Sequence, residues 1–314
     1  MMFSSFFLLL FVVCGVFRNS SGKDIPEPRW AHHMVFDEEN KQVLMFGGAH
    51  QQKLLGDLWS WNGSSWKLLA NSGPAPMCKG VFVYDSHRKA AVLFGCVNAK
   101  DERITDTWIW KNKAWEKANG VAPPSRVHAL GTFDRNTNLV LMFGGFGDGG
   151  PLSDTWAFDG DHWKLLDNQG PKDRIPHGMY WDGKRKSVMM ITVELNKTPG
   201  NISSKNEWWQ WSGSGWKLLP DTVPSIPALQ AFSVFGENKL VVYDGTDLSN
   251  TSGVLWQYMD GKWKSTSNPN PKSRMGHIMV YDPIRKRLVL FGGGKEQIFF
   301  NDTWEWDGKN WKKG

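Results

Sequence analysis

The chain of 314 residues lacks the short motifs of the common nucleotide and hydrolase sites. It has no glycine-rich phosphate loop, no Gly-x-Ser-x-Gly nucleophile elbow and no Cys–His nucleophile arrangement. It has only three cysteines and eight histidines, and the histidines share no metal-ligand spacing with a cysteine or carboxylate. We therefore expect no cofactor and no metal, and the sequence does not identify an enzyme.

Long apolar runs are also scarce. The one such run, Phe6 to Phe17, has twelve residues, whereas a membrane span needs about 20. The run has the length of a secretory h-region and is followed by the small residues Ser20, Ser21 and Gly22. We expect residues 1–22 to be a cleaved signal peptide and the protein to be secreted, periplasmic or on the cell surface. No charged residue precedes the run, so an uncleaved anchor is the alternative.

The formal net charge of +6 suggests a nucleic-acid partner until the basic residues are located. Five lysines directly follow a repeated tryptophan: Lys67, Lys164, Lys217, Lys264 and Lys312. On an outermost strand, a lysine in this position prevents edge-to-edge pairing of sheets. The charge therefore has a structural explanation, and we expect no nucleic-acid partner.

Nineteen tryptophans are the most unusual feature of the composition, and an internal repeat explains them. The final tryptophans of the repeated segments are spaced by 49, 48, 53, 47 and 48 residues: Trp66, Trp115, Trp163, Trp216, Trp263 and Trp311. Another tryptophan stands seven residues before each of these. All tryptophans except Trp30 and Trp208 occupy a repeated position, which favours packing between repeats over a sugar-binding platform.

Each repeat contains four strand signals, here called a to d. Strand a ends in an aromatic residue before an acidic or small residue, and strand b is a β-branched and aliphatic run that ends in a glycine pair. Strand c has aromatic residues two positions apart, as at Trp59 and Trp61, which places them on one face. Strand d carries the final tryptophan, after a turn such as Asn62-Gly63.

This pattern resembles the Kelch repeat, whose period is about 50 residues, rather than the 40–45 residues of WD40 repeats. The Trp-rich form, as in NDTWEWDGKNW, is similar to bacterial-type Kelch proteins and to the central propeller of galactose oxidase. The resemblance covers residues 25 to 314 and implies an all-β fold, a six-bladed β-propeller of four-stranded antiparallel blades. The expected blades are residues 25–70, 71–118, 119–167, 168–220, 221–267 and 268–314.

In Kelch propellers strand a lies nearest the central channel, and the d–a and b–c loops open on one face. The resemblance thus implies a channel mouth surrounded by residues that precede strand a. The candidate ligand-binding residues there are Arg29, Trp30, His32, Arg126, His128, Arg174, His177, Arg274 and His277. Arginine suits a carboxylate or phosphate, but an arginine that recurs at one offset also suits bonding of loop carbonyls, and this structural role is favoured. Residues that break the repeat on this face are Lys79, Asp101, Glu102, Asp148, Glu194, Asp247, Lys295 and Glu296.

Two cysteines remain after removal of the leader. Cys78 precedes strand a of the second repeat, and Cys96 takes the second glycine position after strand b. The a–b hairpin places residue 78 opposite residue 96 or 97, so an exported protein would be expected to form a disulfide between them. Two free, buried thiols are the alternative.

Recognition is the favoured function: an extracytoplasmic, monomeric module that binds a protein segment or a glycan at the loop face. The alternative is a sugar-acid mutarotase or epimerase that uses an arginine and a carboxylate at the mouth. Oxidase chemistry like that of galactose oxidase is excluded, because none of the tyrosines lies in a loop of that face.

Overall fold

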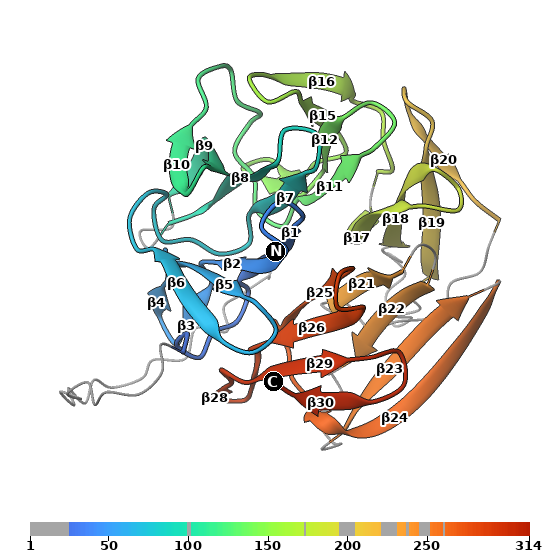
Figure 1. Ribbon diagram of the computed structural model, residues 1–314. Coiled ribbons are helices and arrows are strands. Elements are labelled where there is room, and N and C mark those ends of the chain that lie inside the picture. The colour runs from blue at the N-terminus through green and yellow to red at the C-terminus, as the bar shows by residue number, and fades with distance from the viewer. Residues whose placement is uncertain are drawn as a thin grey trace, which may run out of the picture.

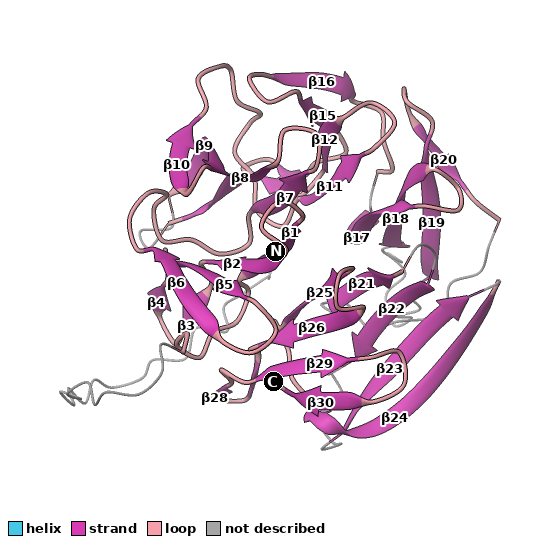
Figure 2. Ribbon diagram, viewed as in Figure 1, coloured by secondary structure: helices cyan, strands magenta, loops and turns pink. Residues whose placement is uncertain are grey.

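A computed structural model describes residues 25–98, 102–172, 174–194, 205–220, 231–236, 239–244, 252–259 and 261–314. All regular secondary structure in these ranges is β-strand (Figure 2). No helix in the described ranges is long and apolar enough to cross a membrane.

Six four-stranded antiparallel sheets form the fold, and each is built from one continuous stretch of chain. The first three contain β1 (His33–Asp37), β2 (Gln42–Phe46), β5 (Leu58–Trp61) and β6 (Trp66–Ala70); β7 (Val81–Asp85), β8 (Ala90–Val97), β9 (Arg103–Lys111) and β10 (Ala114–Lys117); and β11 (Leu130–Asp134), β12 (Leu139–Phe143), β15 (Thr155–Phe158) and β16 (Trp163–Asp167).

The other three contain β17 (Arg174–Asp182), β18 (Ser187–Glu194), β19 (Lys205–Trp211) and β20 (Trp216–Leu218); β21 (Ala231–Phe235), β22 (Lys239–Asp244), β23 (Ser252–Met259) and β24 (Lys262–Lys272); and β25 (Ile278–Asp282), β26 (Arg287–Phe291), β29 (Thr303–Trp306) and β30 (Trp311–Lys313). We call these sheets blades 1 to 6. Their four strands follow one another in sequence order, apart from short hairpins inserted between strands b and c.

The blades form a closed ring. The first strands contact one another in the order β1, β7, β11, β17, β21, β25 and back to β1. They therefore lie innermost, as Figure 1 shows, and the fourth strands lie outermost. The predicted all-β, six-bladed propeller is confirmed.

The hydrophobic core lies between blades. One cluster joins Met34, Met45 and Trp66 of blade 1 to Val289 and Phe291 of blade 6, and similar clusters join the other neighbours. Each outer tryptophan packs towards the preceding blade; the ring centroids of Trp66 and Phe291, for example, are 5.0 Å apart. The tryptophans thus have the packing role that the repeat predicts.

Three of these tryptophans also form a hydrogen bond across the blade interface. The indole Nε1 of Trp66, Trp163 and Trp216 donates to the hydroxyl of Thr303, Thr107 and Thr155 in the preceding blade, at 2.8–2.9 Å. At the corresponding position blades 1, 4 and 5 have Leu58, Trp208 and Leu255. The facing indoles of Trp115, Trp263 and Trp311 accordingly have a buried Nε1 without a partner.

Candidate functional site

The d–a and b–c connections lie on one face of the ring. In an antiparallel blade strands a and c begin at the same edge, so the segments that lead into them share that edge. We call this edge of the ring the mouth face. The candidate ligand-binding residues of the sequence analysis precede or begin strand a, so they lie on this face.

Among the described residues, three blades carry an additional hairpin on the mouth face, inserted between strands b and c. These hairpins are β3 (Ala49–His50) with β4 (Lys53–Leu54) in blade 1, β13 (Phe146–Gly147) with β14 (Gly150–Pro151) in blade 3, and β27 (Gly294–Lys295) with β28 (Ile298–Phe299) in blade 6. Blades 2 and 4 instead extend the b–c pairing directly, to Val97↔Arg103 and Glu194↔Lys205.

The glycine pair explains this difference. Gly47 and Gly48 both have positive φ, at 66° and 97°, and the pairs of blades 3 and 6 do too. A Cβ at Gly48 would lie 2.7 Å from Cβ of His32, so no larger residue fits there without a shift. Blades 2 and 4, which have Cys96 and Val193 instead of the second glycine, continue their strands.

Three of the predicted arginines hold these hairpins in place. The guanidinium of Arg126 donates to both carboxylate oxygens of Asp154, at 2.6 and 2.9 Å, and to the carbonyl oxygens of Gly144 and Pro124. Arg29 and Arg274 bind Asp57 and Asp302 in the same way. The side chains of the three arginines are 0–1% exposed. This geometry favours the structural role, because a ligand would have to displace an ion pair to reach them.

These ion pairs also change the pKa of the three aspartates. Burial alone would raise the pKa of Asp57, Asp154 and Asp302, but the hydrogen bonds and charges of the paired arginines lower it below the ordinary value. A tryptophan of strand c adds a further hydrogen bond, as Trp156 Nε1 does to Asp154 at 2.7 Å. The three carboxylates are therefore ionised at neutral pH.

Arg174 differs from the other three. Its side chain is 21% exposed, and its Nε donates to Oε2 of Glu207 at 2.7 Å. Blade 4 has no glycine pair, and its strands b and c stay paired as far as Glu194↔Lys205. Among the described arginines of the predicted set, Arg174 is the one that solvent reaches.

The predicted histidines are mostly buried. Burial, followed by the charge of a neighbouring arginine, lowers the pKa of His32 well below the usual value and that of His277 to about 3. Burial lowers the pKa of His177 to about 4. These imidazoles are neutral at physiological pH and do not add positive charge to the mouth. His128 is exposed, next to Lys79, and both residues have positive φ, at 58° and 63°.

Trp30 lies at the junction of blades 6 and 1. Its backbone pairs with Ala49, and its indole Nε1 is buried without a hydrogen-bond partner. Ala31 N donates to Gly276 O at 2.8 Å, so the d–a loops of the two blades are bonded to each other. These contacts make Trp30 part of the junction.

The residues that break the repeat have varied surroundings. Glu102 bonds with Asn98, Asp148 pairs with Arg103 at 2.7 Å, and Glu296 has a φ of 56°. Asp101, Asp247 and the side chain of Glu194 lie outside the described residues. No group of three or more metal-binding side chains occurs among the described residues.

Cys78 is buried, and its backbone pairs with Val97, next to Cys96. This agrees with the expected position opposite residue 96 or 97. The side chain of Cys96 lies outside the described part of the structure, and the disulfide therefore stays a prediction.

The sequence analysis missed the hairpin tips. Ile298 is 62% exposed, and the rings of Phe299 in blade 6 and His50 in blade 1 meet edge to face at 5.6 Å. The tips of two neighbouring blades therefore touch and present an apolar side chain. The glycine pairs were the available signal, since they occur in the three blades that bear hairpins.

Comparison with known proteins is consistent with this architecture. The KLHDC2/KLHL20/DRC7 Kelch-repeats domain matches residues 15–190, more than half of the chain. The F-box/kelch-repeat protein At1g51550 of Arabidopsis thaliana is 28% identical over a 196-residue alignment that covers 54% of this chain and 39% of that protein. Mei4-dependent protein 6 of Schizosaccharomyces pombe is 20% identical over 189 residues, covering 51% of this chain and 27% of its own length. The chain thus matches less than half of either relative, and the family match, together with the six blades, shows that it belongs to the Kelch-repeat family.

Proposed function

We propose that this protein is a recognition module that holds a segment of a partner protein on its mouth face. The observation that carries the proposal is the exposed Ile298 on a hairpin that Arg274 and its ion pair hold in place. Kelch propellers commonly act as protein-interaction modules, and an apolar side chain on a rigid support is a suitable anchor for a protein partner. The touching hairpins of blades 1 and 6 form its rim.

The mutarotase or epimerase alternative has less support. It requires an arginine and a carboxylate that are both open to a substrate. Arg126 is buried in its ion pair, and the half-buried Arg174 is engaged by the 5%-exposed Glu207. A glycan would also gain little from the apolar tip of Ile298.

We further propose that the protein acts outside the cytoplasm after loss of residues 1–22. The apolar run Phe6 to Phe17 and the small residues after it support this proposal. The Trp-rich outer strands likewise support a Trp-rich Kelch type similar to the central propeller of galactose oxidase.

The test compares two isoleucines of blade 6. Ile298 and Ile284 are 62% and 57% exposed, but Ile284 lies in an a–b turn on the opposite face. A photo-crosslinking amino acid is placed at each position in turn, and crosslinked proteins are identified by mass spectrometry. The purified partner is then titrated against the Ile298→Asp and Ile284→Asp variants.

We expect crosslinking from position 298, and an affinity about 30-fold lower for Ile298→Asp, the loss that corresponds to a hot-spot side chain. Ile284→Asp should bind like the wild type. Equal crosslinking from both positions, or full affinity of Ile298→Asp, would contradict the proposal.

A further inference from the structure

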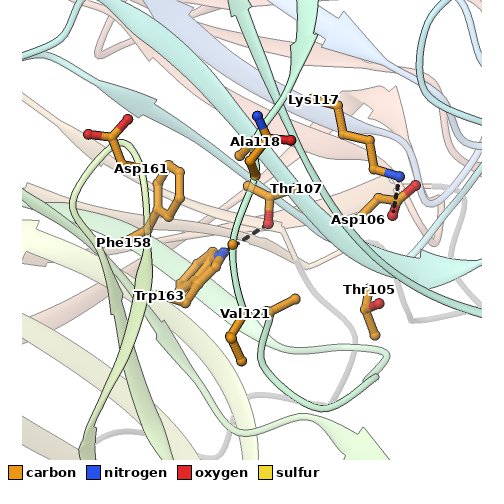
Figure 3. A pocket seen from close by; sticks show the side chains of 12 residues that line it. Thr105, Asp106, Thr107, Lys117, Ala118, Val121, Phe158, Asp161 and Trp163 are labelled. Carbon is orange, nitrogen blue, oxygen red and sulfur yellow. Dashed lines mark hydrogen bonds and ion pairs between the residues drawn. The ribbon is translucent and has the colours of Figure 1, made fainter.

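A pocket of about 320 Å³ lies on the outer flank of the ring, between blades 2 and 3. Its wall from blade 2 contains Asp106 and Lys117, which form a 2.8 Å ion pair, and the segment 118–122 that leaves β10. Its wall from blade 3 contains Phe158, Asp161 and Trp163. Figure 3 shows Asp161 on one side, the Lys117–Asp106 pair on the other and Trp163 between them. The pocket size is within the usual range for ligand sites.

Three departures from the repeat bear on this pocket, although only one of the substituted residues, Ala122, lies in its lining. The first is Met77, which stands in blade 2 where blades 1, 3 and 6 have the buried arginine. Asp106 occupies the position of Asp57, Asp154 and Asp302, two residues before the strand c tryptophan. Without an arginine beside it, Asp106 pairs with Lys117 and is 37% exposed, compared with 18–22% for its three counterparts. The substitution thus places a carboxylate in the pocket wall.

The second departure is Ala122, seven residues after Trp115. The corresponding residues in blades 1 and 3 are Gly73 and Gly170. A Cβ at Gly73 would lie 2.5 Å from Cδ1 of Trp115, so glycine lets the segment after strand d approach the tryptophan of the next blade closely. Ala122 lines the pocket with Trp163 and packs against the apolar cluster that contains Trp163, and we infer that its methyl group keeps segment 118–122 from approaching the indole as closely as Gly73 allows.

The third departure is Glu116. Each of the other five outer strands has a lysine directly after its tryptophan, but β10 has this exposed glutamate. β10 is the edge strand of its blade, so one side of its backbone is open to pairing with another chain. A segment that pairs with β10 would run past Glu116 and Lys117, and Lys117 lies in the pocket wall. The open edge favours a protein segment as the occupant.

The charges favour a cation. Asp161 has no ion-pair or hydrogen-bond partner for its carboxylate among the described residues, and the single lysine in the wall is already engaged by Asp106. Phe158 is fully buried and Trp163 is 8% exposed, so the pocket offers only a small part of the Trp163 ring and not the broad face that a sugar ring stacks on. Val121, 81% exposed, stands at the rim. An arginine matches these features, because its apolar stem covers aliphatic and aromatic surface and its guanidinium binds carboxylates.

We propose that the pocket between blades 2 and 3 is a second recognition site, which takes an arginine side chain of a protein segment lying along β10. This site is separate from the hairpin tips of blades 1 and 6. Its lining includes Ala122, in place of a repeat glycine, and Asp106, whose repeat arginine is replaced by Met77.

The test is a titration with the peptide acetyl-Gly-Arg-Gly-Arg-Gly-amide, followed by NMR of the backbone amides and tryptophan indoles. The control peptide has citrulline in place of arginine, which keeps the shape and removes the charge. We expect the signals of the Trp163 indole and of residues 118–122 to shift with the arginine peptide alone. Binding should weaken with salt, because the site is partly open to solvent.

Two variants locate the interaction. Asp161→Asn should weaken binding about tenfold, as expected for loss of one charge-assisted hydrogen bond, and Ala122→Gly should weaken it by letting segment 118–122 close onto Trp163. The matched control is Glu38→Gln, which removes an exposed carboxylate in the a–b turn of blade 1, outside the pocket lining, and should bind normally. Far-ultraviolet circular dichroism verifies that all variants are folded.

Equal binding of the citrulline peptide, or no shift at Trp163 with the arginine peptide, would overturn the proposal. A shift of Trp163 with chitotriose but with neither peptide would assign the pocket to a glycan instead. The Ile298→Asp variant should bind the arginine peptide normally, so failure at this pocket is distinguishable from failure of the mouth-face proposal.

Discussion

Trp66 of blade 1 donates its indole N–H to the hydroxyl of Thr303 in blade 6, over 2.8 Å. The two residues lie 237 positions apart in the sequence, and their bond joins the first blade to the last. A second bond, from Trp61 Nε1 to Glu305 at 2.8 Å, reinforces the same interface. The ring is therefore closed by side chains and by the contact of β1 with β25, without exchange of a strand.

The threonines that accept these bonds should contribute to stability. Thr107→Val keeps the side-chain shape but leaves the Trp163 indole buried and unsatisfied, which costs about 1–3 kcal/mol of unfolding free energy. Urea unfolding followed by tryptophan fluorescence measures the loss. Thr105→Val, at an exposed position two residues away, should change stability by less than about 0.5 kcal/mol. Equal losses in the two variants would show that the bond is unimportant.

Arg126→Ala should destabilise the protein by about 3 kcal/mol or more, because it leaves the Asp154 carboxylate without its buried partner. Arg174→Ala should also cost about 3 kcal/mol, because it leaves Glu207, which is only 5% exposed, without this partner. Melting temperature and affinity for the mouth-face partner are measured on both proteins. A loss of affinity without a loss of stability in Arg126→Ala would favour a ligand-binding role for this arginine.

The buried histidines predict that stability decreases in acid. In the unfolded chain a histidine takes up a proton near pH 6.5, but folded His277 does so only near pH 3. The unfolded state therefore binds more protons between these values, and the unfolding free energy falls as the pH is lowered from about 6.5. The urea midpoint of His277→Phe, measured between about pH 7 and 4, should decline less steeply than that of the wild type. The variant has no imidazole at this position to take up a proton near pH 6.5, about the ordinary histidine pKa, when the chain unfolds. His87→Phe, at an exposed position, should show the wild-type decline.

Export and the disulfide are tested on the same preparation. Protein secreted by eukaryotic cells should have an intact mass, after removal of glycans, that lacks residues 1–22. Alkylation before reduction should modify neither Cys78 nor Cys96, and reduction should release two thiols. A retained Met1 contradicts the cleaved leader, and two reactive thiols before reduction contradict the disulfide.

The repeat predicts the fold because it reflects packing. The spacing from Trp66 to Trp115 and onwards is the length of one blade, and each outer tryptophan does pack against the preceding blade. The role of Arg126 is harder to predict. Its partner Asp154 lies 28 residues away, and only the folded blade shows that the two side chains meet inside it and not at the channel.

The hairpins and the flank pocket were beyond the sequence for a related reason. A glycine pair indicates a turn but not the exposure of Ile298 at a tip. Ala122 is unremarkable in the sequence, and only the structure shows that it lines a pocket with Asp106 and with Trp163 of the next blade.

The pattern of tryptophan–threonine bonds makes the ring mechanically uneven. The interfaces of blade 6 with 1, blade 2 with 3 and blade 3 with 4 carry the bond, whereas those of blade 1 with 2, blade 4 with 5 and blade 5 with 6 have Trp115, Trp263 and Trp311 without an acceptor. Blades 2, 3 and 4 are therefore linked to one another by these bonds, as are blades 6 and 1. Blade 5 has an unbonded interface on each side, so under heat or tension we expect the ring to open there, or between blades 1 and 2, before it opens at a bonded interface.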